Sequence, residues 1–238
     1  MKKKQGYAYY RREYSRKGYR RVFRVILLFF LFCSAIQFVK TFLIDVYTIR
    51  NTSMQPVLVS GKRVVATPVV WGVKNPFTGK AFDFISRPDR GDLVVMVSPH
   101  VDEYSWGMRY LDQYIRFLSL QKLSFVYRNS PEWGSAFQVK RIVALPGETV
   151  YIKNYQAFIR KADSDNFIIE TLLTDADYNP QTGTLNGSQA PFSTDSEAVT
   201  LGSDQYFVLG DNRPSSLDSR TYGPVSRDRI SAKILFSY

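Results

Sequence analysis

The chain has 238 residues, enough for one domain with additional segments, and its 32 basic and 21 acidic side chains give a net charge of +11. A single cysteine excludes an intramolecular disulfide and a zinc–thiolate cluster. The only histidine, His100, would have to serve any histidine-based catalytic triad or metal site. We therefore expect no disulfide, no metal ion and no cofactor.

The positive charge is concentrated at the N-terminus, where residues 1–24 hold ten lysine or arginine residues and one glutamate. Tyrosines alternate with these basic residues, a pattern that also occurs in nucleic-acid-binding arms. We prefer an interpretation in which this basic head lies against anionic membrane lipids, and we expect no nucleic-acid partner.

An apolar run follows the basic head. Residues 25–39 read VILLFFLFCSAIQFV, and the run continues past Lys40 to Ile44. About 20 residues span a bilayer core, and basic flanks stay in the cytoplasm, so residues 25–45 are predicted to be a single transmembrane helix. Residues 46–238 would then lie on the outer face of the cell membrane. The alternatives are a cleavable signal peptide with a weak site at Cys33-Ser34-Ala35, or lipid attachment to Cys33, which the bulky Phe32 disfavours.

Short β-branched runs dominate the remaining chain and predict a mainly antiparallel β domain. The expected strands are 64–70, 93–97, 139–143, 149–152, 167–169, 206–209 and 230–236. Met108, Leu111, Ile115 and Leu118 recur at helical spacing and predict a helix over residues 105–121. We expect this helix to pack on the sheet, with membrane or substrate contact as the alternative. Residues 173–204 are polar and are expected to form long loops or a small insert.

Four stretches belong together in this chain. They read IRNTSMQPVL over residues 49–58, RGDLVV over 90–95, VKRIVALPGE over 139–148 and GDNRPSSLDSR over 210–220. Each is common alone, but in this order behind an N-terminal anchor they resemble the type I signal peptidases, membrane-bound serine proteases that remove signal peptides from preproteins. The resemblance implies a β catalytic core of residues 46–97, 138–153 and 205–238, with insertions at 98–137 and 154–204. Its implied partners are signal peptides of preproteins, membrane lipids and the secretion machinery.

The resemblance makes Ser53 the nucleophile and Lys140 its general base. The lone histidine supports this assignment independently, because a Ser-Lys dyad needs no histidine. A lysine accepts a proton only when it is neutral, so its pKa must fall by about 2–4 units from about 10.4. The apolar strand around Lys140 can supply the necessary burial. On its own, Lys140 would be interpreted as an exposed strand lysine.

Other residues acquire roles by the same resemblance. Ser216 matches the family serine that orients the lysine. The neighbouring Ser215 is the alternative match to that serine. The charged residues of the last stretch are expected to form scaffolding salt bridges: Asp211, Arg213, Asp218 and Arg220. The expected lining of shallow substrate pockets is Ile49, Met54, Leu58 and Val139, with ordinary core packing as the alternative.

Asn51 departs from the family pattern, which has glycine or a hydroxyl residue two positions before the nucleophile. Its side-chain NH2 can donate to the oxyanion that forms during acyl transfer, or the residue can simply shape the turn. The rival functions are a soluble, self-cleaving repressor with a Ser-Lys dyad, an anchored binding protein that has lost its catalytic activity, and a nucleic-acid adaptor built on the basic head. The apolar segment argues against the first, and the intact serine and lysine argue against the second.

Overall fold

The computed structural model describes residues 18–36, 39, 43–71, 86–101, 106–119, 123–126, 128, 135–175, 178–182 and 195–238. The backbone forms two compact units, Met1–Thr41 and Phe42–Tyr238. Most of the basic head, residues 1–17, lies outside the described residues. The same holds for residues 37–38 and 40–42 of the predicted transmembrane segment and for parts of both predicted insertions.

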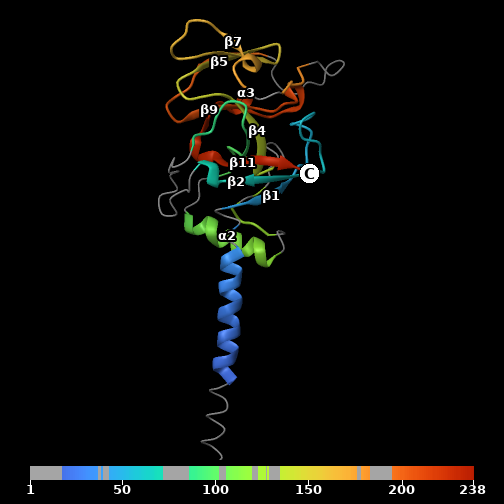
Figure 1. Ribbon diagram of the computed structural model, residues 1–238, viewed down its shortest axis with the longest axis vertical. Helices are drawn as coiled ribbons and strands as arrows, with labels where there is room; N and C mark the ends of the chain where they lie inside the picture. The colour runs from blue at the N-terminus through green and yellow to red at the C-terminus, as the bar shows by residue number, and fades with distance from the viewer. Residues whose placement is uncertain are drawn as a thin grey trace, which may run out of the picture. The chain divides into compact units, whose positions relative to one another are not determined.

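In the first unit, residues 18–36 form an α-helix (Figure 1, blue), which begins in the basic head and contains most of the predicted apolar span. A search of the described residues finds no helix that combines the length and the apolarity needed to cross a membrane.

The second unit is mainly β, as predicted. Its larger sheet has seven strands in the order β1-β2-β11-β3-β4-β9-β10, and every neighbouring pair is antiparallel. The strands are β1 (Asp45–Thr48), β2 (Arg63–Thr67), β3 (Leu93–Val97), β4 (Phe137–Ala144), β9 (Gln205–Leu209), β10 (Val225–Ser226) and β11 (Ile230–Ser237).

A second, four-stranded antiparallel sheet has the order β7-β6-β5-β8. Its strands are β5 (Thr149–Lys153), β6 (Gln156–Arg160), β7 (Ile168–Ile169) and β8 (Ser196–Thr200). Three of these strands come from residues 154–204, the expected second insertion. This segment contributes to the core, because Ala157, Ile159 and Leu201 are buried in one apolar cluster with Phe207 and Leu209 of β9.

Alternation along the strands places apolar side chains on both faces of the larger sheet. In β3, Val94 and Met96 join a cluster around Trp71, whereas Val95 joins a cluster that contains Met54. Burial on both faces explains why β3 reads as a continuous apolar run rather than an alternating one. The predicted strand 64–70 is shorter in the structure because residues Val69–Trp71 turn into a 3₁₀ helix.

The predicted helix is present as α2 (Trp106–Leu118). Its expected packing on the sheet is not what the structure shows, since Met108, Leu111 and Leu118 are all exposed. The unpredicted β1, β6, β8 and β10 are short strands, and β8 carries mostly polar, exposed side chains. Such an edge strand is defined by its pairing with β5 rather than by its own composition.

Candidate active site

Ser53 lies in a tight turn between β1 and β2. Two backbone hydrogen bonds close this turn, from the Gln55 N–H to the Thr52 carbonyl (3.2 Å) and from the Leu58 N–H to the Met54 carbonyl (2.8 Å). The turn is held down by the apolar side chains of Met54 and Leu58, both buried in the core beneath it. Ser53 itself is 5% exposed, so the proposed nucleophile is fixed on a packed element.

Lys140 lies in the middle of β4, where it pairs with Val94 of β3 and shares a face with Ile142. Both apolar residues are fully buried, and Lys140 is only 2% exposed. Its Nζ donates a hydrogen bond to Ser216 Oγ at 2.9 Å. Burial lowers the pKa of Lys140 from 10.5 to about 8, although the nearby Asp218 carboxylate opposes the shift. The structure thus supplies the desolvation that a neutral lysine requires.

The polar loop 210–220 packs directly against the turn that holds Ser53. The Asn212 N–H donates to the Ser53 carbonyl (3.0 Å), and Asn212 Nδ2 donates to the Thr52 carbonyl (3.2 Å). Gly210 lies so close to this turn that a Cβ atom there would be 2.6 Å from the Ser53 carbonyl oxygen and closer still to Ser216 Oγ. The loop therefore brings Ser216 close to the Ser53 turn and within hydrogen-bond distance of Lys140.

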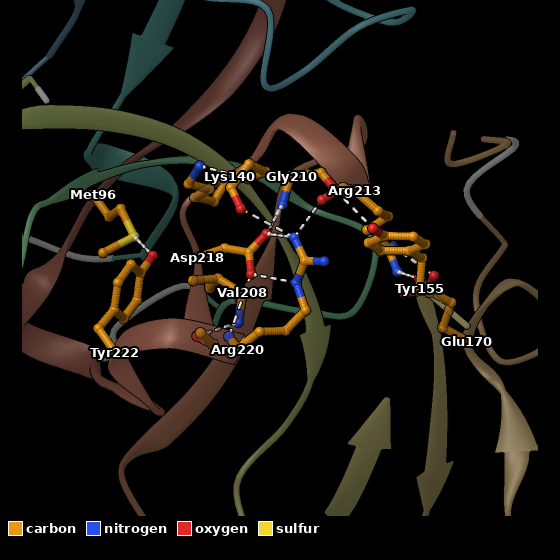
Figure 2. A network of polar contacts seen from close by, with 12 residues as sticks. Met96, Lys140, Tyr155, Glu170, Val208, Gly210, Arg213, Asp218, Arg220 and Tyr222 are labelled. Atoms are coloured by element: carbon orange, nitrogen blue, oxygen red, sulfur yellow. Dashed lines mark hydrogen bonds and ion pairs between the residues drawn. The ribbon is translucent and has the colours of Figure 1, made fainter. Parts of the chain in front are cut away.

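Within the loop, Asp218 and Arg220 form the predicted scaffolding pair (Figure 2), with Arg220 Nε donating to Asp218 Oδ1 at 2.8 Å and Arg220 Nη2 to Asp218 Oδ2 at 2.9 Å. Burial opposes ionisation of Asp218, but the hydrogen bonds and charge of Arg220 hold its pKa below the ordinary value. Arg220 Nη2 also donates to the Ser216 carbonyl at 3.0 Å. The pair therefore fixes the backbone of the residue that contacts Lys140.

Asp211 and Arg213 form salt bridges too, but with partners outside the loop. Asp211 accepts two hydrogen bonds from Arg141 of β4, at 2.8 and 2.7 Å. Arg213 is fully buried and pairs with Glu170, which lies beside β7 in the predicted insertion (Figure 2). Arg141 follows Lys140 in the third motif, so its presence was visible in the sequence. Glu170 lies in an unmatched segment, and no spacing signal identifies it.

Asn51 contacts Ser53 in an unexpected orientation. Its side-chain oxygen accepts hydrogen bonds from Ser53 Oγ (2.9 Å) and from the Ser53 N–H (3.4 Å). A backbone N–H can only donate, so the amide oxygen, not the NH2, faces the nucleophile. Among the described residues, Ser53 Oγ bonds to Asn51 and Lys140 Nζ to Ser216, so serine and lysine are not hydrogen-bonded to each other.

The Asn51 geometry yields a specific prediction. Asn51→Ala should lower kcat less than about ten-fold and destabilise the fold by about 1 kcal/mol, because the variant loses a turn hydrogen bond but no oxyanion donor. Asn51→Ser should recover most of that stability. Steady-state kinetics and thermal unfolding of both variants measure these effects. A kcat loss of about 10²–10³ in Asn51→Ala with unchanged KM would instead assign the NH2 to the oxyanion after an amide rotation.

The predicted pocket residues divide into two groups. Ile49, Met54 and Leu58 are buried in one core cluster, as the alternative of ordinary packing expects. Val139 packs at the edge of the same cluster and remains partly exposed. Of these four side chains, Val139 therefore offers the most surface to a peptide.

The structure places His100 in a separate environment. Its ring nitrogens lie 2.8 Å from Ser98 Oγ and 3.1 Å from the Arg128 carbonyl oxygen. Over the described ranges, no group of three or more histidine, cysteine, aspartate or glutamate side chains is arranged to hold a metal ion.

Comparison with known proteins agrees with the motifs. Signal peptidase I of Buchnera aphidicola subsp. Baizongia pistaciae is 24% identical over 91% of this chain and 76% of its own length. Signal peptidase IB of Staphylococcus aureus strain COL is 26% identical over 84% of this chain and 80% of its own. A crystal structure of a signal peptidase I from Enterococcus faecalis V583 aligns with 64% of this chain and 99% of its own at 24% identity, with a TM-score of 0.33. The family model described as "Signal peptidase, peptidase S26" matches residues 22–238, and the chain therefore belongs to this family.

Proposed function

We propose that this chain is a membrane-anchored serine endopeptidase that removes N-terminal signal peptides from exported preproteins. The observation that carries the proposal is the environment of Lys140, a lysine buried among apolar side chains whose Nζ donates to Ser216 Oγ. Burying an ammonium group is costly, and a strand that needed only packing would hold an apolar side chain at this position. Burial favours the neutral form of a lysine, and the neutral form is the one that can act as a base.

The proposed reaction begins when the Ser53 side chain turns from Asn51 toward Lys140. Neutral Lys140 takes the hydroxyl proton as Ser53 Oγ attacks the carbonyl carbon of the scissile peptide bond, forming a tetrahedral intermediate. The protonated lysine then delivers its proton to the leaving amine, and an acyl-enzyme ester remains on Ser53. A water molecule, deprotonated by the same lysine, hydrolyses the ester and restores the serine.

Ser216 and the loop around it hold the base in position. Because Ser216 Oγ accepts from Lys140 Nζ, the lysine can keep a fixed orientation while its proton is taken up and released. The Asp218–Arg220 pair holds Ser216 through the Arg220 hydrogen bond to its carbonyl. The substrate is proposed to bind as an extended strand with small side chains over Val139, where a shallow apolar surface rejects larger ones by overlap.

The proposal places residues 25–45 across the cell membrane as a single span, with the basic head in the cytoplasm and residues 46–238 outside. Support comes from the apolar run, the basic residues before it and the helix over residues 18–36. An anchor would hold Ser53 near the membrane–water interface, where signal peptides emerge, and would raise its effective concentration there.

This orientation predicts the result of a protease-protection experiment. Protease added to right-side-out vesicles should digest residues 46–238 and spare the basic head. Protection of residues 46–238 would reject this orientation.

The direct test is incubation of the detergent-solubilised full chain with a model preprotein, with the cleavage site read by mass spectrometry. The expected result is a single cut that releases the intact signal peptide. Binding without cleavage would support an inactive, anchored binding protein of the same fold and would reject the proposed enzyme.

The pKa of Lys140 predicts the pH dependence of this activity. The neutral lysine is the active form, so kcat/KM should rise with pH and level off above about pH 8, following the depressed pKa. Ser216→Ala should lower kcat sharply across this range, because the lysine loses its orienting partner. Initial rates from about pH 5 to 10 measure both effects. A flat profile would exclude Lys140 as the base.

A further inference from the structure

The helix α2 presents an exposed apolar face that the proposed chemistry does not use. Leu111 is 52% exposed and Leu118 is 68% exposed, and Leu123 just after the helix is 64% exposed. Leu111 and Leu118 are seven residues apart, about two helical turns, so they lie on the same side of the helix. Met108, which is exposed, and Ile115, which is partly buried, lie on the same side, so these apolar side chains form one stripe along the helix.

Asp112, about 100° around the helix from Leu111, attaches α2 to its own return segment. Asp112 is completely buried, and its carboxylate accepts hydrogen bonds from Ser124 Oγ, from the Phe125 N–H at 2.8 Å and from the Val126 N–H at 3.2 Å. These contacts fix the rotation of the helix about its axis. The buried polar contacts of Asp112 therefore set the direction in which the neighbouring Leu111 points.

The strand topology determines which end of the larger sheet carries α2. The helix lies in the connection that leaves β3 at Val97 and returns at Phe137 of β4. Through the antiparallel registers β1–β2, β2–β11, β11–β3 and β3–β4, Phe137 falls at the same end of the sheet as Asp45, where β1 begins.

Ring contacts, independently of the register, link α2 and Phe137 to β1. The Phe137 ring lies 5.7 Å from the Tyr47 ring of β1, and the Arg116 guanidinium of α2 lies 5.7 Å from the Phe137 ring. In Figure 1, α2 lies beside β1 at one end of the second unit, and β5 and β7 lie at the other.

Asp45 is also the last residue of the proposed transmembrane span, so this end of the sheet meets the membrane if the proposed anchoring holds. The residues just before β1, Leu43 and Ile44, are apolar and exposed like the stripe on α2. A lipid surface explains why apolar side chains gather on this end of the sheet beside the point where the chain leaves the bilayer. An amphipathic helix in such a position typically lies in the headgroup region with its apolar face about 5–10 Å deep.

We propose that α2 is an interfacial helix that rests on the outer leaflet through Leu111 and Leu118 and thereby sets the orientation of the catalytic unit on the membrane. The occupant of the apolar face is lipid. The inference rests on the proposed anchored protease, because it takes the end of the sheet at Asp45 to be the membrane-facing one. Its test does not depend on cleavage.

The test uses the full chain reconstituted in phosphatidylcholine–phosphatidylglycerol vesicles. Cys33→Ser removes the only cysteine, and Leu111→Cys, Leu118→Cys or Leu172→Cys then introduces a single site for a polarity-sensitive fluorophore. Leu172 is the matched control, since it is a leucine that is 77% exposed and lies next to β7 in the smaller sheet. Lipids with a nitroxide near the headgroup should quench the labels at 111 and 118 by about half or more and leave the label at 172 unchanged.

Three results would overturn the proposal. Equal quenching at 111 and 172, with equal access of aqueous iodide, would show that α2 does not touch lipid. Quenching that appears only when preprotein is added would assign the face to the substrate. Energy transfer between labels on different protein molecules that grows with the protein-to-lipid ratio would assign the face to a second copy of the chain. The same labels in Ser53→Ala protein should give the same quenching, so a failure here is distinguishable from a failure of the proposed protease activity.

Discussion

Ser53→Ala and Lys140→Ala are each expected to reduce preprotein cleavage by at least about 10³-fold while leaving the fold intact. Without Ser53 Oγ there is no acyl-enzyme. Without Lys140 no group among the described neighbours of Ser53 is a competent base, since Ser216 carries only a neutral hydroxyl and the Asn51 amide oxygen is a weak base. Single-turnover cleavage of a model preprotein, with thermal unfolding to confirm folding, measures both effects.

Two further variants make this prediction specific. His100→Ala should retain nearly full activity, because its ring contacts Ser98 and the Arg128 carbonyl and not the proposed site. Lys140→Met should be as inactive as Lys140→Ala but better folded, since it fills the apolar space beside Val94 without burying an amine. Activity that survives in Lys140→Met, or disappears in His100→Ala, would rule out the Ser-Lys assignment.

Gly210→Ala is expected to be the most damaging glycine substitution among those whose surroundings the structure describes. Its added Cβ would lie 2.6 Å from the Ser53 carbonyl oxygen and closer still to Ser216, and neither group has room to retreat. The Ser53 carbonyl is held by the Asn212 N–H, and Ser216 is completely buried. We expect a stability loss of about 1–3 kcal/mol and a drop in kcat of about 10²-fold, because the clash separates the proposed nucleophile from the serine that orients the base.

Gly202→Ala is the matched control for this substitution. Its added Cβ would meet only the flexible end of the Gln205 side chain, the nearest atom at 3.2 Å, so activity and stability should stay near normal. Cleavage assays and thermal unfolding of the two variants give the comparison. If Gly210→Ala is as active as Gly202→Ala, the close packing of the loop on the Ser53 turn is not needed for catalysis.

Strands β3 and β4 were predictable because both are β-branched runs bounded by turn residues, and local composition is enough to recognise such segments. The amphipathic helix was predictable from the spacing of its apolar residues. Its exposure was not, because burial depends on which element covers a face. The polar β8 became a strand only through pairing with β5, a contact that joins residues about 50 positions apart.

The chemical identity of the proposed site was also available from the sequence by itself, since Ser53, Lys140 and Ser216 stand in motifs whose order and spacing identify the family. Residue types and local order are properties of the chain and need no folding to be recognised. The Asp218–Arg220 pair could also be predicted from the sequence, because its two members are two residues apart within one loop.

Only the tertiary structure determined the burial, the ion pairs and the hydrogen-bond directions of these residues. The pKa of Lys140 depends on desolvation by neighbours such as Val94, which arrives from another strand, and the position of Arg213 depends on Glu170 from a segment that no motif covers. The direction of the Asn51 amide was likewise set by the turn geometry that aims the Ser53 N–H at it. Burial, ion pairing and hydrogen-bond direction are relations between groups brought together by folding, so they follow from the packed structure and not from the order of residues along the chain.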